Sequence, residues 1–273
     1  MHKQDISFLI RIYFSVWKWH RWTVKAAAWA RGCFVGLWLG VFSREQLHAI
    51  DEEFYTRSKK RFAGQWNYHS QEYNRSGLFD YEKKVLPNYF GDCRRLLLYG
   101  AGGGRDTLAL LRMGYRVDAF ESHPDLAVAA NELLRQEGYD PVVQLVPRDQ
   151  GPTTDAIYDG IIVSYGTYML IQGRKHRIRL LRQLRAQTQV RCPIFISFFH
   201  RNGTPRRYKA SVLVANIIRR TLRREFTELG DWLDPYYRHH FTEEEIVSEL
   251  FEGGFDIIHY DTTGYGHAIG TAI

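Results

Sequence analysis

Residues 96–106 read LLLYGAGGGRD, and this stretch decides the fold. Four apolar residues, typical of a buried strand, lead directly into a loop with glycine at positions 100, 102, 103 and 104. Because glycine has no Cβ, such a loop reaches positive φ and lets a ligand approach the backbone closely. A helix expected from Gly104 onward adds unpaired N–H groups at its first turn. A strand, a glycine loop and a helix in this order favour binding of a nucleotide-like ligand.

An acidic residue follows at the distance that such a ligand requires. Glu121 ends the next expected strand, 21 residues after Gly100, where a carboxylate accepts hydrogen bonds from both hydroxyl groups of a ribose. The glycines are spaced G-x-G-x-G, and Arg105 stands where the dinucleotide fingerprint needs its third glycine. Two alternatives stay open: an NAD site, or a tight turn beside a solvent-exposed Glu121 with no ligand.

From about residue 79 the chain alternates between strand and helix patterns, which predicts βαβ units and a parallel sheet. The expected strands cover 95–99, 115–121, 142–146, 157–163 and 193–199. The expected helices cover 79–89, 104–113, 124–136 and 174–188. A basic helical insert over 205–224 and a helix capped by Thr242 and Glu245 come next. Two last strands, 255–260 and 266–273, flank a glycine-containing turn and predict a hairpin.

This pattern resembles the class I S-adenosylmethionine-dependent methyltransferases, from about residue 79 to the end of the chain. The resemblance implies an α/β fold: a Rossmann-like three-layer sandwich, whose mostly parallel seven-stranded sheet ends in an antiparallel hairpin, plus an N-terminal helical extension. We expect a helical cap over 1–77 and an S-adenosylmethionine-binding methyltransferase domain over 78–273, with a helical lid insert at about 201–235. The resemblance also implies that S-adenosyl-L-methionine is the cofactor and that the methyl group is transferred to an oxygen or nitrogen atom of a small molecule.

The resemblance also implies cofactor contacts. Glu121 would hold the ribose hydroxyls, His123 would flank the adenine, and Asp149 looks like the acid that contacts the adenine. Leu98 departs from the pattern, because many members carry an acid two residues before the first glycine. Asp106 has two interpretations: it replaces this acid in part, or it only favours the N-terminal end of its own helix dipole. Four residues before the sheet are expected to close over the cofactor: Tyr68, Tyr73, Asn74 and Arg75. The full expected cofactor set is Gly100, Ala101, Gly102, Gly104, Asp106, Glu121, Ser122, His123, Asp149 and Ser164.

Catalytic candidates follow from where an open parallel sheet binds its substrate, beyond the carboxyl ends of the strands. Methyl transfer needs alignment in a dry cleft, plus proton removal when the acceptor is a hydroxyl. His200, after the fifth strand, is the first candidate general base, and Tyr165 is an orienting hydroxyl. His239, His240 and His267 are reserves. Each histidine has a second interpretation as a packing residue. No metal site is predicted, since these histidines show no recognisable ligand spacing.

Charge and aromatic residues are unevenly distributed. No acid occurs between Asp159 and Glu225, an interval with fifteen lysines and arginines. This excess solvates helix faces or attracts an anionic partner, so a small anionic acceptor is the working hypothesis. Five of the seven tryptophans lie in the first 42 residues, interleaved with lysine and arginine. This amphipathic segment has three interpretations: a helical cap, a homodimer contact, or a peripheral membrane anchor. Its apolar stretch over 26–42 is shorter than the roughly 20 residues of a spanning helix.

Location and rival functions complete the sequence-based expectations. Three widely spaced cysteines show no C-x-x-C pair, which favours a reducing, cytoplasmic compartment, either free or at the inner membrane face. A non-catalytic nucleotide-binding or interaction module stays an alternative to the enzyme. An RNA methyltransferase is a second alternative, ranked lower because no RNA-binding module is recognisable and nucleic-acid partners are not expected.

Overall fold

The computed structural model describes residues 3–61 and 68–273, and the side chains of 12–56 and 68–273. These residues form two compact units. The helical unit holds the described residues up to Ser43 together with Gly203–Asp234, and the sheet unit holds Arg44–Asn202 together with Pro235–Ile273. Part of the loop expected over 64–77 lies outside the described residues.

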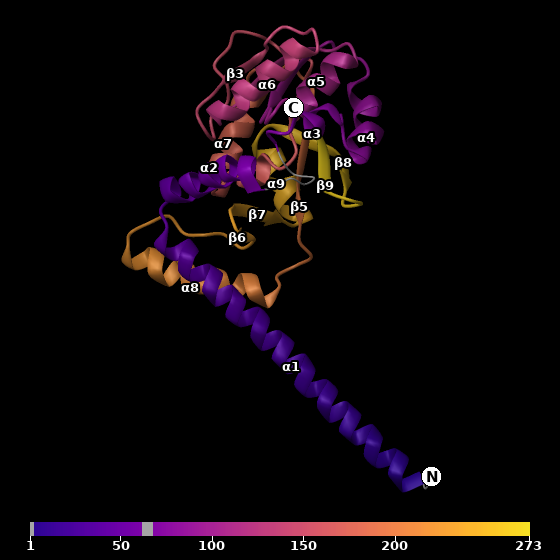
Figure 1. The fold of residues 1–273 in the computed structure, drawn as a ribbon, viewed down its shortest axis with the longest axis vertical. Coiled ribbons are helices and arrows are strands. Elements are labelled where there is room, and N and C mark those ends of the chain that lie inside the picture. The colour runs from indigo at the N-terminus through magenta and orange to yellow at the C-terminus, as the bar shows by residue number, and fades with distance from the viewer. Residues whose placement is uncertain (1–2, 62–67) are drawn as a thin grey trace. The chain divides into compact units, whose positions relative to one another are not determined.

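The sheet unit is built around a mostly parallel sheet (Figure 1). Its strand order is β3-β2-β1-β4-β5-β9-β8, in which β9 runs antiparallel to both β5 and β8. The strands are β1 Arg95–Tyr99, β2 Arg116–Glu121, β3 Val143–Leu145, β4 Gly160–Val163, β5 Pro193–His200, β8 Phe255–Asp261 and β9 Gly266–Ala272. The expected mostly parallel sheet with its C-terminal antiparallel hairpin is therefore confirmed, although the sheet has more strands than the seven expected.

Alternation along the strands explains the two helical layers. In β1, Leu96 and Leu98 join one apolar cluster, whereas Leu97 and Tyr99 join another on the opposite face. The first cluster packs under α4 Asp80–Phe90, α5 Arg105–Arg112 and α6 Pro124–Gln136. The second packs under α7 Arg174–Arg185 and α9 Glu243–Glu252. Both faces are covered, so the fold is a three-layer α/β sandwich.

Several elements of the sheet unit were not anticipated from the sequence. Strand β7, Tyr237–Phe241, pairs in parallel with the last two residues of β5. A short α3, Gln71–Arg75, begins at Ser70, whose side chain accepts a hydrogen bond from the N–H of Tyr73. A 3-10 turn, Tyr168–Leu170, follows β4. Ser43 and Gln46 have the spacing of a capping box, which predicts a helix from Ser43 to about Arg61, and the structure has α2, Arg44–Arg61.

In the helical unit, α1 Lys3–Val41 packs along α8 Arg206–Thr221, with the short β6 Asp231–Leu233 beside both (Figure 1). Glycines at positions 32, 36 and 40 form a stripe on α1. A Cβ at Gly36 would overlap the carbonyl oxygen of Ser211, so only glycine permits this close approach. Arg219 donates to the carbonyl oxygens of Leu39 (2.8 Å) and Phe42 (3.1 Å), which satisfies the C-terminal end of α1.

The two units divide the chain differently from the sequence-based expectation. The predicted cap over 1–77 is split, because α1 belongs to the helical unit while α2 and α3 belong to the sheet unit. The predicted insert at about 201–235 contains α8, whose partner is α1. The physical reason is the glycine stripe, which gives α8 a close-packed surface that a helical pattern alone does not reveal. A lid function for this insert stays a prediction.

Candidate cofactor site

The loop after β1 adopts the backbone shape that its glycines allow. Gly100, Gly102 and Gly104 have φ of +82°, +54° and +96°. A Cβ at Gly100 would overlap the side chain of Thr167, whereas a Cβ at Gly102 would meet only Tyr68, at 3.8 Å. The N–H groups of Gly100 and Ala101 both donate to the carbonyl oxygen of Phe120, at 2.8 and 3.0 Å. The loop is thus held against the end of β2 and leaves Gly102 beside open space.

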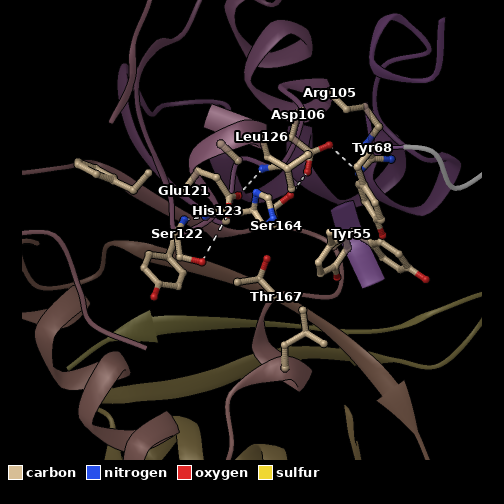
Figure 2. Close-up of a pocket in the computed structure, with 18 of the residues that line it drawn as sticks. Tyr55, Tyr68, Arg105, Asp106, Glu121, Ser122, His123, Leu126, Ser164 and Thr167 are labelled. Atoms are coloured by element: carbon tan, nitrogen blue, oxygen red, sulfur yellow. Dashed lines mark hydrogen bonds and ion pairs between the residues drawn. The ribbon is translucent and has the colours of Figure 1, made fainter. Parts of the chain in front are cut away.

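Glu121 faces this loop from the end of β2 (Figure 2). Its Oε2 accepts the N–H of Gly102 at 2.6 Å, and its Oε1 accepts the N–H groups of Ser122 and His123, both at 2.8 Å. The side chain is only 7% exposed. A carboxylate oxygen has two lone pairs, so these three backbone bonds leave an acceptor position on Oε2 for a ligand hydroxyl.

A buried charged cluster lies at the start of α5. Arg105 Nη2 is 2.5 Å from Asp106 Oδ1 and 3.2 Å from Glu82 Oε1, and its guanidinium lies 3.6 Å above the Phe79 ring. The hydroxyl of Ser164 donates to Asp106. Burial, and then the nearby Asp106 carboxylate, raise the pKa of Glu82, and Arg105 offsets this only in part. Two buried carboxylates therefore share one guanidinium, and Arg105 and Asp106 also line the pocket.

Helix α2 forms one wall of the site through polar residues spaced along one helix face. Arg44 Nη2 binds Asp149 Oδ2 at 2.6 Å, and His48 Nε2 lies 3.3 Å from the same oxygen. Asp149 itself has φ of +57°. Burial alone would raise the pKa of Asp149, but the hydrogen bonds from His48 and Arg44 outweigh it and hold the pKa below its usual value.

A second ion pair joins α2 to the loop after β3, which also carries Asp149. Arg148 contacts the fully buried Asp51, whose Oδ1 accepts the N–H of Tyr237 at 3.1 Å. Burial raises the pKa of Asp51 to about 6, even though Arg148 acts in the opposite direction.

These elements enclose a pocket with about 960 Å³ of space free of protein atoms, part of it open to solvent. Figure 2 shows Glu121 and His123 on one side of it and Tyr68 and Arg105 on the other. The expected cofactor residues that line it are Gly100, Ala101, Gly102, Asp106, Glu121, Ser122, His123, Asp149 and Ser164. Gly104 does not line the pocket, because it caps α5 and faces α6. A Cβ at Gly104 would lie only 3.1 Å from the Cβ of Ala130.

The expected catalytic residues are only partly brought together. Tyr165 lines the pocket and packs its ring against Phe79 and Tyr265. The three histidines do not line it. His200 contacts Asn202 Oδ1 (2.7 Å) and the Tyr260 hydroxyl (2.9 Å). His239 is buried against Phe241, and His240 stacks on Phe199. Their placement matches the packing interpretation better than the catalytic one.

Other pocket residues were only partly foreseen. Tyr68, Tyr73 and Asn74 line the pocket as expected for the segment before the sheet, whereas Arg75 instead binds Glu137 at 2.7 Å. Glu52, Tyr55 and Arg148 also line the pocket, and the sequence patterns do not single them out. The signal for α2 was available, because its pocket-side and ion-paired residues recur at helical spacing: Arg44, His48, Asp51, Glu52 and Tyr55.

Comparison with known proteins places this geometry in context. No family model matches the chain. A protein-L-isoaspartate O-methyltransferase of Salinibacter ruber is 34% identical over 85 residues, which cover 31% of this chain and 37% of that protein. The chain thus matches little more than a third of the length of this curated relative.

Solved structures match far more of the chain. An S-adenosylmethionine-dependent methyltransferase from Methanosarcina mazei superposes with a TM-score of 0.57 at 20% identity, covering 72% of this chain and 99% of that one. The 1,6-didemethyltoxoflavin-N1-methyltransferase of Burkholderia thailandensis, solved with S-adenosylhomocysteine, has a TM-score of 0.55 at 18% identity. The match covers 85% of this chain and 90% of that one. This chain has the class I methyltransferase fold. The resemblance suggested by the glycine loop and Glu121 is confirmed at the level of fold, and its structural neighbours are S-adenosylmethionine-dependent transferases.

Replacing Glu121 with Gln in this class I fold should weaken binding of S-adenosylhomocysteine. A neutral amide loses the charge-assisted acceptor and presents an NH2 group toward backbone N–H donors, a change of about 1.5–3 kcal/mol, or roughly ten- to a hundredfold in Kd. Calorimetric titration measures this, with Glu252→Gln on the surface of α9 as control. Equal affinity of both variants and the wild type would contradict the role assigned to Glu121.

Asp51 predicts a pH dependence of folding. In the folded protein the pKa of Asp51 is about 6, above its ordinary value of 3.8, so the folded state binds more protons than the unfolded state between these pH values. The contribution of Asp51 to the free energy of unfolding is therefore fully present below about pH 4. It is lost as the pH rises through 6, and the loss reaches up to about 3 kcal/mol. Urea unfolding at several pH values measures this. The free energy of unfolding should fall less steeply with rising pH for Asp51→Asn than for the wild type. Asp256→Asn, on the exposed side of β8, should keep the wild-type profile; an unchanged profile in Asp51→Asn would refute the assignment.

Proposed function

We propose that this chain transfers the methyl group of S-adenosyl-L-methionine to an oxygen or nitrogen atom of a small molecule. The observation that carries this proposal is the pairing of Glu121 with the glycine loop, at 2.6 Å, inside the class I fold. When bound, the cofactor supplies an electrophilic methyl group on a sulfonium. The protein residues bind, orient and exclude water, which is most of what an in-line displacement needs.

The polar groups of the pocket fit such a ligand at both ends. Buried side-chain atoms without a hydrogen-bond partner include Asn74 Oδ1, Arg105 Nη1 and His123 Nδ1, all from residues that line the pocket. Unsatisfied buried polar atoms are rare in native proteins, so a cluster of them indicates a ligand with matching groups. Arg105 and Asn74 suit the carboxylate and amino groups of a methionine, and His123 lies on the Glu121 side, where the adenosine would be held.

The unusual Leu98 is explained by the same arrangement. Many members of the family carry an acid at the position of Leu98. Here the position holds an apolar side chain, which is completely buried in the core beneath α4–α6. Asp106, held by Arg105 and Ser164, brings a carboxylate into the pocket from the first turn of α5. We infer that Asp106 receives the methionine amino group in place of the missing acid.

On the acceptor side, Tyr165 is the hydroxyl best placed to orient a substrate. Burial and its neighbour Tyr265 raise the pKa of Tyr165 well above the ordinary value, so it stays protonated at neutral pH and does not act as a base. Of the described histidines, only His123 lines the pocket. We therefore propose catalysis by alignment instead of proton removal by His200, His239 or His240. The proton of the acceptor would leave to solvent or to a pocket carboxylate.

The charge of the pocket bears on the acceptor. Its lining carries four carboxylates, of Glu52, Asp106, Glu121 and Asp149, against the two guanidinium groups of Arg105 and Arg148. This excess of negative charge suits a sulfonium and a neutral or amine acceptor better than an anionic one. The anionic acceptor inferred from the basic interval over 160–224 stays a prediction that the pocket does not favour.

Activity is tested with labelled cofactor. Purified protein should transfer label to the small-molecule fraction of a cell extract, and not to its RNA fraction. Tyr165→Phe should lower turnover while S-adenosylhomocysteine affinity is kept, and Tyr139→Phe, which follows α6 and does not line the pocket, should behave as wild type. Binding of S-adenosylhomocysteine without transfer to any fraction would favour the non-catalytic module, and label in RNA would favour the RNA methyltransferase.

We further propose that the helical unit attaches the protein to the inner face of a membrane, in keeping with the reducing compartment inferred from its three free cysteines. The glycine contacts of α1 with α8 run from Gly32 to Gly40, and the described part of α1 before Gly32 is mostly exposed, including its large aromatic side chains; Trp19 is 68% and Trp22 is 66% exposed. Lysine and arginine lie among them, which suits acidic headgroups. Among the described residues no single helix is long and apolar enough to cross a membrane, although α1 and α2 taken together pass that test.

Sedimentation with acidic phospholipid vesicles measures this attachment. The full chain should sediment with the vesicles, and less so at high salt. The double variant Trp19→Ala, Trp22→Ala should lose most of the bound fraction, whereas Phe251→Ala, which removes an aromatic side chain 61% exposed on α9, should not. Equal sedimentation of both variants, together with a concentration-dependent dimer, would favour the homodimer interpretation instead.

A further inference from the structure

The hairpin of β8 and β9 carries three potential metal ligands on one face. His259 and Asp261 are two residues apart on β8, so their side chains point to the same side of the sheet. Asp261 pairs directly with His267 of β9, and His259 pairs with Ile269. The ligand atoms of His259, Asp261 and His267 all lie within 4.8 Å of one another. They belong to a cavity separate from the cofactor site, beside Phe79, Tyr81 and Lys84.

The two imidazoles are prepared as ligands. His267 is 2% exposed, and its Nδ1 lies 2.8 Å from the carbonyl oxygen of Tyr265. A carbonyl oxygen only accepts, so Nδ1 carries the proton and Nε2 carries the lone pair. Nε2 of His267 and Nε2 of His259 are both buried without a hydrogen-bond partner. An imidazole oriented by a backbone carbonyl, with its other nitrogen free, is the usual arrangement of a metal-binding histidine.

The carboxylate is oriented as well. Asp261 Oδ1 accepts the N–H of Thr263 at 2.8 Å, across the hairpin turn. The turn therefore fixes both the acid and, through Tyr265, one of the histidines.

We propose that His259, Asp261 and His267 bind a zinc ion. Two imidazole nitrogens and one carboxylate oxygen are a typical zinc ligand set, whereas magnesium and calcium prefer oxygen alone. Three protein ligands leave a fourth position, toward the open cavity, for water. Tetrahedral zinc holds its ligand atoms about 3.4 Å apart, and the three ligand atoms here lie within 4.8 Å of one another.

The ion would lie outside the cofactor pocket but next to its aromatic wall. Tyr265, from the turn of the hairpin, contacts Tyr165 with ring centroids 4.9 Å apart, and Tyr165 lines the pocket. Zinc would therefore fix the turn that supports the acceptor side. The assignment of the metal site itself does not rest on the proposed methyltransferase function, and it departs from the sequence-based expectation of no metal.

The test uses the full chain without an affinity tag, treated with a chelator and then titrated with Zn²⁺ by calorimetry and with Co²⁺ by visible absorption. The wild type should bind one ion at this site, with the intense absorption of tetrahedral Co²⁺. His259→Gln and Asp261→Asn should each weaken binding at least about tenfold, and Asp256→Asn, an exposed carboxylate on the same strand, should not.

A second measurement guards against misfolded variants. Zinc should raise the Tm of the wild type and of Asp256→Asn, because binding to the folded state stabilises it, and should leave the Tm of His259→Gln and Asp261→Asn unchanged. The absence of saturable binding in the wild type would overturn the proposal. So would equal affinity, or an equal zinc-dependent rise in Tm, in all four proteins.

Discussion

The hydrogen bond from the N–H of Gly102 to Glu121 is the constraint on which the site depends. It exists because β1 and β2 are parallel and in register, with Tyr99 opposite Phe120, so that the ends of both strands reach the same edge of the sheet. The carbonyl oxygen of Phe120 receives two further N–H groups from the loop. The glycine loop thus cannot move without breaking three bonds, and the carboxylate is presented to a ligand in a fixed position.

The rest of the site is organised around buried charge. Arg44 with Asp149, and Arg148 with Asp51, join α2 to the loop after β3, and Arg105 joins α5 to α4 through Glu82. Charges removed from water are tolerated only when they are paired, so each of these contacts fixes the position of an element that lines the pocket. The remaining excess of carboxylates suits a positively charged ligand such as the sulfonium cofactor.

The helical unit has two different surfaces along one helix. The glycines of α1 at positions 32, 36 and 40 bring its backbone close to α8, and Arg219 satisfies the carbonyl oxygens at its end. The described part of α1 before Gly32 lies outside these contacts and exposes a row of tryptophans next to basic residues. Large exposed aromatic side chains beside cations are typical of a surface that contacts a partner or a membrane.

The sequence by itself determined the layers of the fold, the glycine loop and its partner Glu121. Local patterns suffice for these features, because alternating and helical periodicities and a requirement for positive φ are written in neighbouring residues. Tertiary structure alone decided which distant residues meet. It placed α2 as a wall of the pocket, left His200, His239 and His240 outside it, and brought His267 opposite Asp261. Strand register and helix packing set these meetings over long separations in the chain, and no local pattern encodes them.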